Sequence, residues 1–389
     1  MKKTLTLFAL GLGLSMGMSH VPLQAQQAPL TWSNPHRQAP NLALDEQLWG
    51  SLGQPGDKQA LIQSIDHSLR YLDTPAAVRA YQNYPIRWIT RDRVRRSLQR
   101  FRHLVLTSNS PQELQAAVKR EFVFYKSVGS PRYGGQVFFT GYYEPTYQAS
   151  RVPTAEYRYP LYRRPSNFES WKAPHPSRAQ LEGSDGTGKD SILAGYELVW
   201  LRDRLQAFLV QVQGSARLQL TDGTTMTVGF HGSTDYPYIS VGQEMIKDGL
   251  HPADGFTLPK MINIFQQNPD LLNVYIPRNN RFIFFRETNG APATGSISVP
   301  VTPDRSIATD KSLMPPGALA LIHTRIPFPD GQGGMMTPEV SRFVLDQDTG
   351  SAITTPGRVD VFMGTGPVAG DRAGVMGYRG ALYYLMLKE

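Results

Sequence analysis

The chain has 389 residues, of which 40% are hydrophobic, and a formal net charge of +8 at pH 7. This length allows two folded domains or one large domain with an insertion. The absence of cysteine excludes a disulfide framework and a cysteine-borne lipid anchor. No basic run with interleaved aromatic residues is present, so nucleic acid is not an expected partner.

The first 25 residues are typical of a secretory signal segment. Lys2 and Lys3 precede an apolar run from Leu5 to Met18, and the small residue Ala25 follows. No later run of about 18 apolar residues is present, so no other membrane-spanning segment is expected. We therefore expect an exported, periplasmic protein. Any association with the outer membrane would not use a lipidated cysteine.

Residues 26–45, rich in Gln, Pro, Ala and Asn, are expected to form a linker, and residues 46–134 a helical region. Four apolar residues recur at helical spacing and would share one face: Val94, Leu98, Phe101 and Val105. Ser110, followed by proline and then by Glu113, predicts a helix start. The six arginines between residues 91 and 102 are expected to form a solvated face.

From residue 135 onward, short runs rich in aromatic and β-branched residues predict strands. They fall into two regions, residues 135–270 and residues 271–389. Within the first region, Asp222-Gly223 separates two alternating runs and predicts a β-hairpin. The 35 glycines and 30 prolines also indicate many turns, so the chain is expected to be mainly β.

The run RVDVFMG, residues 358–364, places an aspartate in a predicted strand, where aspartate is unfavourable. Strand alternation assigns one apolar set to the core: Val359, Val361 and Met363. Asp360 and Phe362 would face a groove, and the aromatic wall would raise the pKa of Asp360, as a proton donor to a glycosidic oxygen requires. Gly364 and Gly366 would let a ligand approach the backbone. A buried aspartate that ties a loop through backbone amides is an equally good interpretation.

Other chemistries find weaker support. The eight histidines have no paired spacing, so no metal site is expected. GTGPVAG, residues 364–370, lacks the lysine and spacing of a phosphate loop. Asp348 lies in an Asp-Thr-Gly sequence like that of aspartic proteases, which need two aspartates sharing a proton. The chain has no second Asp-Thr-Gly sequence, although the partner subunit of a dimer could supply one. A protease centred on Asp348 therefore remains an alternative.

Several ordered segments resemble the membrane-bound lytic murein transglycosylase A family. They are FTGYYEP (139–145), QVQGSARL (211–218), YPYISVGQ (236–243), and, within residues 306–374, SIATDKSLMPPGA, QDTGSAI and RVDVFMGTGPVAGDRAG. The similarity runs from about Gly134 to the C-terminus. Its last part also resembles the three-aspartate domain, whose acids fall here on Asp310, Asp348 and Asp360.

The resemblance implies two domains with a groove between them. A double-psi β-barrel of residues 271–389, completed by the N-terminal region, would carry a smaller inserted β domain of residues 135–270. It implies a peptidoglycan lytic exotransglycosylase that cleaves the β-1,4 bond between N-acetylmuramic acid and N-acetylglucosamine and leaves a 1,6-anhydro ring. No cofactor or metal is expected. The expected partners are peptidoglycan glycan strands and cell-wall synthesis or division complexes, with the protein a monomer. A non-catalytic wall-binding module is an alternative.

The same resemblance assigns Asp360 as the one catalytic residue, first acid and then base, because the sugar's own C6 hydroxyl is the nucleophile. Tyrosines would stack on sugar rings, and hydroxyl and amide groups would hydrogen-bond them. The residues expected to bind substrate are Thr140, Tyr142, Tyr143, Gln213, Ser215, Tyr238, Ser240, Asp310, Asp348, Gly364 and Gly366. For Asp310 and Asp348 a structural loop role is equally expected. Glu144, a conceivable second acid for hydrolysis, is discounted because it adjoins Pro145 at a predicted strand end.

Overall fold

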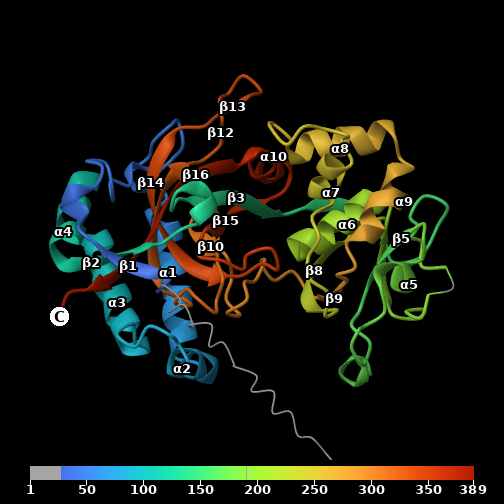
Figure 1. Cartoon of the computed structure of the whole chain (residues 1–389), viewed down its shortest axis with the longest axis horizontal. Helices are drawn as coiled ribbons and strands as arrows, with labels where there is room; N and C mark the ends of the chain where they lie inside the picture. The colour runs from blue at the N-terminus through green and yellow to red at the C-terminus, as the bar shows by residue number, and fades with distance from the viewer. Residues whose placement is uncertain (1–27, 190) are drawn as a thin grey trace, which may run out of the picture.

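Two β lobes stand side by side in the computed structural model, which describes residues 28–189 and 191–389 (Figure 1). Within these residues the larger lobe is built on an eight-stranded sheet and the smaller lobe on a six-stranded sheet. This architecture agrees with the mainly β, two-domain fold predicted from the sequence. The signal segment predicted for residues 1–25 lies outside the described residues.

The sheet of the larger lobe closes into a barrel. Its strands are β1 (Leu30–Ser33), β2 (Phe122–Ser127), β3 (Val137–Glu144), β10 (Ser306–Ala308), β11 (Leu319–Arg325), β14 (Glu339–Asp348), β15 (Arg358–Thr365) and β16 (Gly377–Leu387). They follow the order β1-β2-β16-β11-β14-β10-β15-β3, and β3 pairs again with β16. Because β16 is long, residues 383–387 pair with β2 and residues 377–380 pair with β3. The strands from β16 round to β3 therefore form a closed ring, whose double-psi connectivity stays a prediction.

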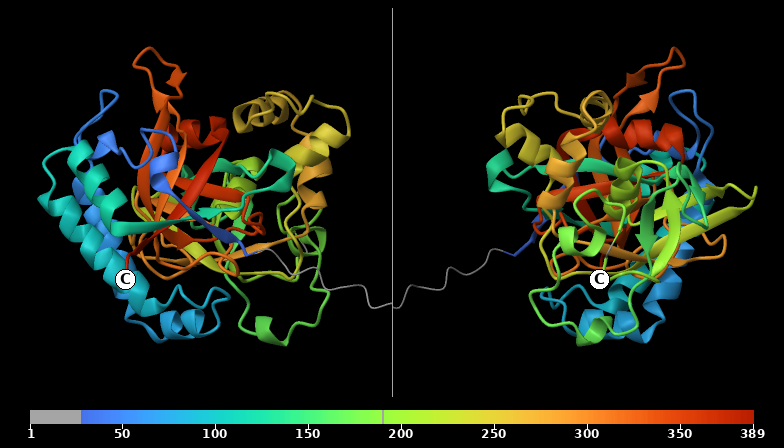
Figure 2. Two further views of the ribbon diagram at one scale, coloured as in Figure 1. Left: turned by 60° about the vertical axis from the view of Figure 1, so that its left-hand side comes forward. Right: turned by 90° about the vertical axis from the view of Figure 1, so that its right-hand side faces the viewer.

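Residues 46–134 contribute helices along one flank of this barrel (Figure 2): α1 (Lys58–Leu72), α2 (Pro75–Gln82), α3 (Arg91–Thr107) and α4 (Pro111–Glu121). The predicted apolar face of α3 is confirmed, because all four of its residues are buried: Val94, Leu98, Phe101 and Val105. The predicted start of α4 is also confirmed, since the Ser110 hydroxyl accepts a hydrogen bond from the Glu113 amide at 3.1 Å. No helix in the described part of the chain is both long and apolar enough to cross a bilayer.

The arginines of α3 form the predicted solvated face only in part, since Arg96 is exposed, Arg93 is buried and the other four are half-buried. Arg100 and Arg102 form ion pairs of 2.6 and 2.8 Å with Glu121 and Asp66, respectively. Arg93 is buried, and its guanidinium donates to a backbone carbonyl near the C-terminus at 3.3 Å. The correction has a simple cause: the neighbouring helices present acidic side chains and the barrel presents a carbonyl, and these partners are distant in sequence.

The smaller lobe contains β4 (Thr146–Ser150), β5 (Tyr159–Tyr162), β6 (Glu197–Leu201), β7 (Ser215–Leu220), β8 (Thr225–Ser233) and β9 (Ile283–Glu287). The strand order is β5-β6-β4-β7-β8-β9, and a bridge between Arg163 and Phe285 joins its two ends. The predicted hairpin at Asp222-Gly223 is confirmed, because β7 and β8 pair antiparallel and Gly223 has a φ of +85°. The helices of this lobe are α5 (Arg178–Glu182), α6 (Arg204–Gln213), α7 (Val241–Lys247), α8 (Leu258–Gln267) and α9 (Leu271–Tyr275).

Strand pairing sets the borders of the insertion. β3 belongs to the larger sheet and β9 to the smaller sheet, so the insertion lies between residues 145 and 288, whereas the sequence prediction put it at 135–270. Residues 26–45 were predicted to be a linker, yet they include β1, which pairs with β2. The sequence patterns of these strands identify them as strands but do not reveal the partner with which each one pairs.

The two lobes also touch through helices. The helix α10 (Pro367–Val375) follows β15 and lies against α8 of the smaller lobe (Figure 1). At this contact Gly374 is so close to Pro259 that an added Cβ would lie 3.0 Å from the proline ring. A hairpin of β12 (Phe328–Pro329) and β13 (Met335–Met336) projects from the larger lobe nearby.

A buried ion-pair cluster fixes the N-terminal segment to the barrel. The Arg305 side chain is fully buried and pairs with Asp45 and Asp57, each at 2.5 Å. The Asp45 carboxylate also accepts the Phe343 amide of β14 at 2.9 Å. The acidic residues come from the region before the helices, so this cluster links residues about 250 positions apart in the sequence.

We predict that Arg305→Met lowers the free energy of unfolding by about 3–5 kcal/mol, because it leaves a buried carboxylate without its cation. Urea denaturation measures the change. The control is Arg96→Met, which breaks the exposed pair with Asp92 and should cost less than about 1 kcal/mol. Equal losses for the two variants would contradict the importance of the buried cluster.

Candidate active site

Neighbouring strands of the barrel bring a row of residues into register. Ala308 of β10 pairs with Asp348 of β14 on one side and with Asp360 of β15 on the other. Asp360 in turn pairs with Thr140 of β3. Paired residues of adjacent strands face the same side of a sheet, and two strand spacings separate the two aspartates by about 10 Å. The small Ala308 side chain leaves the space between them open.

The Asp360 carboxylate is held by one of its two oxygens. Its Oδ1 accepts hydrogen bonds from the Thr140 hydroxyl and from the Arg358 guanidinium, the latter at 3.0 Å. Among the described residues no hydrogen bond reaches Oδ2. The side chain is 20% exposed. Asp360 is therefore neither buried nor bonded to the backbone through its side chain, and it presents one free oxygen.

The surroundings of Asp360 differ in part from the prediction. The core set Val359, Val361 and Met363 is buried, as predicted. The groups that bind the carboxylate directly are the Thr140 hydroxyl and the Arg358 guanidinium, not the Phe362 ring that was predicted to lie beside it. Phe362 is itself buried and packs on Tyr142, with ring centroids 5.2 Å apart. The ring is occupied by that packing, so polar groups replace the predicted apolar environment.

Asp348 stands at the end of β14 and is oriented by the backbone. Its Oδ1 accepts the amide hydrogens of Ser296 and Thr349 at 2.9 and 2.8 Å. Burial raises the pKa of Asp348 above its usual value, against the opposing effect of these hydrogen bonds. The hydroxyl of Tyr142 lies close to this carboxyl group, and burial raises the pKa of Tyr142 as well.

Lys311 holds the end of β14, where Asp348 lies, through two polar contacts. Its ammonium group binds the backbone carbonyl of Asp348 and the carboxylate of Asp346. Asp346 is fully buried and also accepts a hydrogen bond of 2.6 Å from the Tyr384 hydroxyl. This cluster fixes the β14 end, and with it the position of Asp348.

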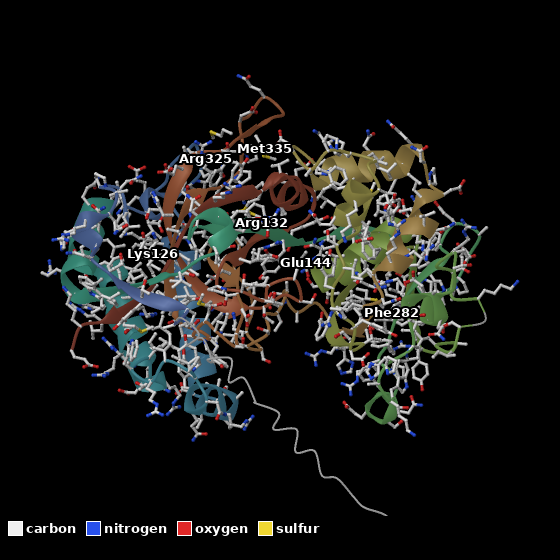
Figure 3. All side chains as sticks on the ribbon, in the orientation of Figure 1. Lys126, Arg132, Glu144, Phe282, Arg325 and Met335 are labelled. Atoms are coloured by element: carbon white, nitrogen blue, oxygen red, sulfur yellow. The ribbon has the colours of Figure 1, made fainter. Side chains whose placement is uncertain are left out.

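A cavity of about 400 Å³ lies between the lobes beside this row. The larger lobe contributes Tyr142, Asp348 and Ser351, among others, and the smaller lobe contributes Gln213, Ser215, Arg281 and Arg286. Glu144 also lines it at the junction of the lobes (Figure 3). Its buried carboxylate accepts the Thr365 hydroxyl at 2.8 Å. The predicted groove between two domains is thus present.

A smaller cavity adjoins the first and is lined by Tyr238 and Arg281. Burial raises the pKa of the Tyr238 hydroxyl. The nearby charge of Arg358 lowers this pKa, and the nearby charge of Asp360 raises it. The two cavities share Gln211, which is buried. The charge of Asp360 therefore acts on both Tyr142, which lines the first cavity, and Tyr238, which lines the second.

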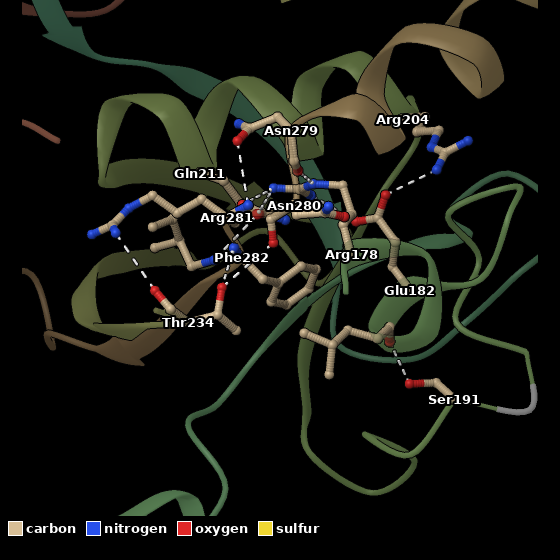
Figure 4. A network of polar contacts seen from close by, with 12 residues as sticks. Arg178, Glu182, Ser191, Arg204, Gln211, Thr234, Asn279, Asn280, Arg281 and Phe282 are labelled. Atoms are coloured by element: carbon tan, nitrogen blue, oxygen red, sulfur yellow. Dashed lines mark hydrogen bonds and ion pairs between the residues drawn. The ribbon is translucent and has the colours of Figure 1, made fainter. Parts of the chain in front are cut away.

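A buried polar network supports the smaller-lobe wall of these cavities (Figure 4). Arg178 pairs with Glu182 at 3.0 Å and donates to the Gln211 side chain at 2.9 Å. Arg204 pairs with the same glutamate at 2.9 Å. The sequence prediction missed this network, because nothing in the local sequence around Arg178 marks a buried arginine.

Two predicted substrate-binding residues, Tyr143 and Ser240, have structural contacts, and their binding role stays a prediction. The Tyr143 ring is buried against Gly370 of α10, on the face opposite to Tyr142. Its backbone amide donates to the Gln213 side chain at 3.0 Å. Ser240 caps α7, where its hydroxyl accepts the Gln243 amide at 3.3 Å.

Three further predicted residues act through turn geometry. The Asp310 carboxylate accepts the Ser312 amide and hydroxyl at 3.0 and 2.6 Å, which closes a local turn. Gly364 and Gly366 have φ values of +108° and +88°, which favour glycine. Gly364 also packs against Pro303, so backbone conformation, not ligand access, explains this glycine. The predicted residues that line the cavities are Tyr142, Gln213, Ser215, Tyr238 and Asp348. Thr140 and Asp360 do not line either cavity and belong to the row of paired strand residues that includes Asp348.

Comparison with known proteins identifies related chains. The family model of the MltA specific insert domain matches residues 138–286, and that of the 3D domain matches residues 305–386. Membrane-bound lytic murein transglycosylase A of Escherichia coli (strain K12) is 29% identical over 259 residues, which cover 66% of this chain and 67% of that protein.

Solved structures extend the similarity over most of the chain. E. coli MltA with bound chitohexaose superposes with a TM-score of 0.69 at 22% identity, covering 93% of this chain and 95% of that one, which shows the shared fold. The lytic transglycosylase LtgG of Burkholderia pseudomallei is 30% identical, with 95% of this chain and 98% of that chain covered and a TM-score of 0.50. The chain therefore belongs to the membrane-bound lytic murein transglycosylase A family.

Proposed function

We propose that this protein is a lytic transglycosylase that cleaves the bond between N-acetylmuramic acid and N-acetylglucosamine in peptidoglycan and forms 1,6-anhydromuropeptides. Family membership supports the reaction class. The observation that carries the assignment of the residue is the free Oδ2 of Asp360, which lies in strand register with Asp348, a residue that lines the cavity between the two lobes. The same proposal includes an exported, periplasmic location and a double-psi connectivity of the barrel.

One carboxyl group suffices for this reaction. With a proton on Oδ2, Asp360 protonates the glycosidic oxygen while the bond between that oxygen and C1 of the muramic acid breaks. The C6 hydroxyl of the same sugar then attacks C1, and the Asp360 carboxylate removes the hydroxyl proton. The proton returns to Asp360, and no water is consumed. Because the nucleophile is tethered to the reacting ring, proximity replaces a second catalytic group.

The hydrogen bonds to Oδ1 have a matching role. The Thr140 hydroxyl and the Arg358 guanidinium both bind this oxygen, which leaves Oδ2 as the atom that exchanges protons with the sugar. Held in this way, the carboxyl group cannot rotate freely about its last bond. Thr140 and Arg358 are therefore positioning residues for Asp360.

The geometry argues against the protease alternative. Aspartic proteases need two carboxyl groups close enough to share one proton. Asp348 and Asp360 lie two strands apart, about 10 Å by strand spacing. Glu144 is already bonded to Thr365, and a second acid for hydrolysis is not needed in the mechanism above.

We predict that Asp360→Asn lowers kcat by about 10²–10⁴-fold, because the amide cannot supply or remove the proton. The variant keeps its strand pairs and should unfold like the wild type. Mass spectrometry of the soluble products from purified peptidoglycan measures the reaction, since anhydro products lack two hydrogens and one oxygen relative to hydrolysed ones.

Asp222→Asn, in the exposed hairpin turn of the smaller lobe, is the matched control and should retain activity. Products with reducing ends alone would indicate a hydrolase, released peptides a protease, and binding without soluble product a non-catalytic module. Each of these results would overturn the proposed reaction.

The Thr140→Val variant removes one hydrogen bond to Oδ1 with little change of shape, and valine suits a strand. We expect kcat to fall about tenfold, since a hydrogen bond to a charged group contributes about 1.5–3 kcal/mol, while KM stays within about twofold. Steady-state kinetics on a soluble glycan strand tests this. A raised KM with unchanged kcat would show that Thr140 binds substrate instead.

Asp348 offers a pH test of a functional role. Its folded-state pKa is raised, so protonation favours the folded protein: this contribution is present below about pH 4 and is lost as the pH rises through the folded-state pKa. Asp348→Asn keeps an oxygen for the Ser296 and Thr349 amides and avoids the loss. Near pH 7 its free energy of unfolding should equal or exceed that of the wild type, and the difference should close on acidification.

If Asp348 orients a sugar hydroxyl, the same variant should lose about tenfold in activity without losing stability. Urea denaturation at several pH values, combined with activity assays, separates the two effects. Lower stability at pH 7 with full activity would assign Asp348 a purely structural loop role.

A further inference from the structure

The smaller-lobe wall of the 400 Å³ cavity carries an arginine without an acidic partner. Arg281 is partly buried and lines both this cavity and the adjoining one. Its Nη1 donates to the backbone carbonyls of Thr234 and Tyr236 at 3.5 and 3.1 Å. Its Nε is buried and has no hydrogen-bond partner among the described residues. A buried guanidinium bound only by carbonyls retains its full charge without compensation.

The acid of the adjoining buried network does not neutralise this charge. Glu182 is shared by Arg178 and Arg204, so that cluster already contains more cations than anions. Figure 4 shows the Arg281 guanidinium directed away from Glu182. Burial lowers the pKa of Arg281, which reflects the cost of holding the charge there. An anion placed in the cavity would offset that cost.

A second arginine lines the same cavity from the end of β9. Arg286 is exposed and forms no ion pair within the described residues. The acids of the opposite wall have other partners: Asp348 accepts two backbone amides, and Glu144 accepts the Thr365 hydroxyl. The two walls therefore differ in charge, and the positive charge lies on the smaller lobe.

We propose that Arg281 and Arg286 bind a carboxylate carried by the glycan, so that the cavity prefers muramic acid polymers over neutral N-acetylglucosamine polymers. The identity of the polymer rests on the proposed function. Arginine suits this role because its planar donors match a carboxylate. The carboxylate has two sources in such polymers: the lactyl group of muramic acid, free when no peptide is attached, and the peptide itself.

Binding measurements in the Asp360→Asn background test the proposal without turnover. The probes are chitohexaose, which is neutral, a peptide-free muramic acid glycan, and the same glycan with its peptides. Isothermal titration calorimetry should show at least one carboxylate-bearing glycan binding about tenfold more tightly than chitohexaose, a difference of about 1.4 kcal/mol. This preference should shrink as salt is added.

Arg286→Gln and Arg281→Gln should each reduce the preference about tenfold while leaving chitohexaose affinity within about twofold. Arg286→Lys, which keeps the charge, should retain part of it. Arg325→Gln changes the net charge equally, at a site on the larger lobe away from the cavity (Figure 3), and should have no effect. Because Arg286 is exposed, its variants keep the test valid even if Arg281→Gln unfolds.

The two carboxylate-bearing probes distinguish the sources. Preference for the peptide-free glycan identifies the lactyl carboxylate, and preference for the peptide-bearing glycan alone identifies the peptide. Equal affinity for all three probes, or Arg286→Gln affecting all three equally, would overturn the proposal and leave the transglycosylase assignment intact. No binding of any probe would instead count against the proposed function.

Discussion

The position of β3 is the constraint on which the site depends. This strand precedes the insertion in the sequence, yet it lies between β15 and β16 and closes the barrel. Its pairing with β15 sets Thr140 opposite Asp360 and Tyr142 opposite Phe362. Because the chain passes from the end of β3 directly into the smaller lobe, the strand that positions the Asp360 carboxylate also positions the opposite wall of the cavity.

The polar surroundings of Asp360 suit the proposed mechanism, in which a single acid acts twice. A carboxyl group in an apolar pocket would take up a proton readily as a base but would release it poorly when it must act as an acid. Here Thr140 and Arg358 bind one oxygen, and the other is free. Oδ1 is thus bound by the two side chains that orient the carboxylate, and Oδ2 is left to exchange the proton. This division suits a reaction in which the proton leaves and returns.

Local patterns in the sequence predicted the features that depend on interactions between residues close together in the chain. The alternation around Asp360, the α3 face and the hairpin at Asp222-Gly223 were all recoverable, since each depends on residues a few positions apart. The borders of the insertion, the burial of Arg305 and the lone Arg281 were not, because each depends on a partner, or on its absence, far along the chain. The predicted sugar-binding residues divide in the same way. Tyr142 lines the cavity, whereas the Tyr143 ring packs against Gly370, since successive residues of β3 face opposite sides.

Both walls of the cavity are anchored independently, so their separation is set where the lobes meet. Lys311 and Asp346 fix the Asp348 side, and Arg178 with Glu182 fixes the other. A buried charge network resists small displacements, because any movement leaves a charge unpaired. The contact between α8 and α10 is one of the places where the two lobes meet, and Gly374 allows that contact to be close. A side chain at this position would meet the Pro259 ring and move the walls apart. The distance between the acid of one lobe and the arginines of the other would grow with it.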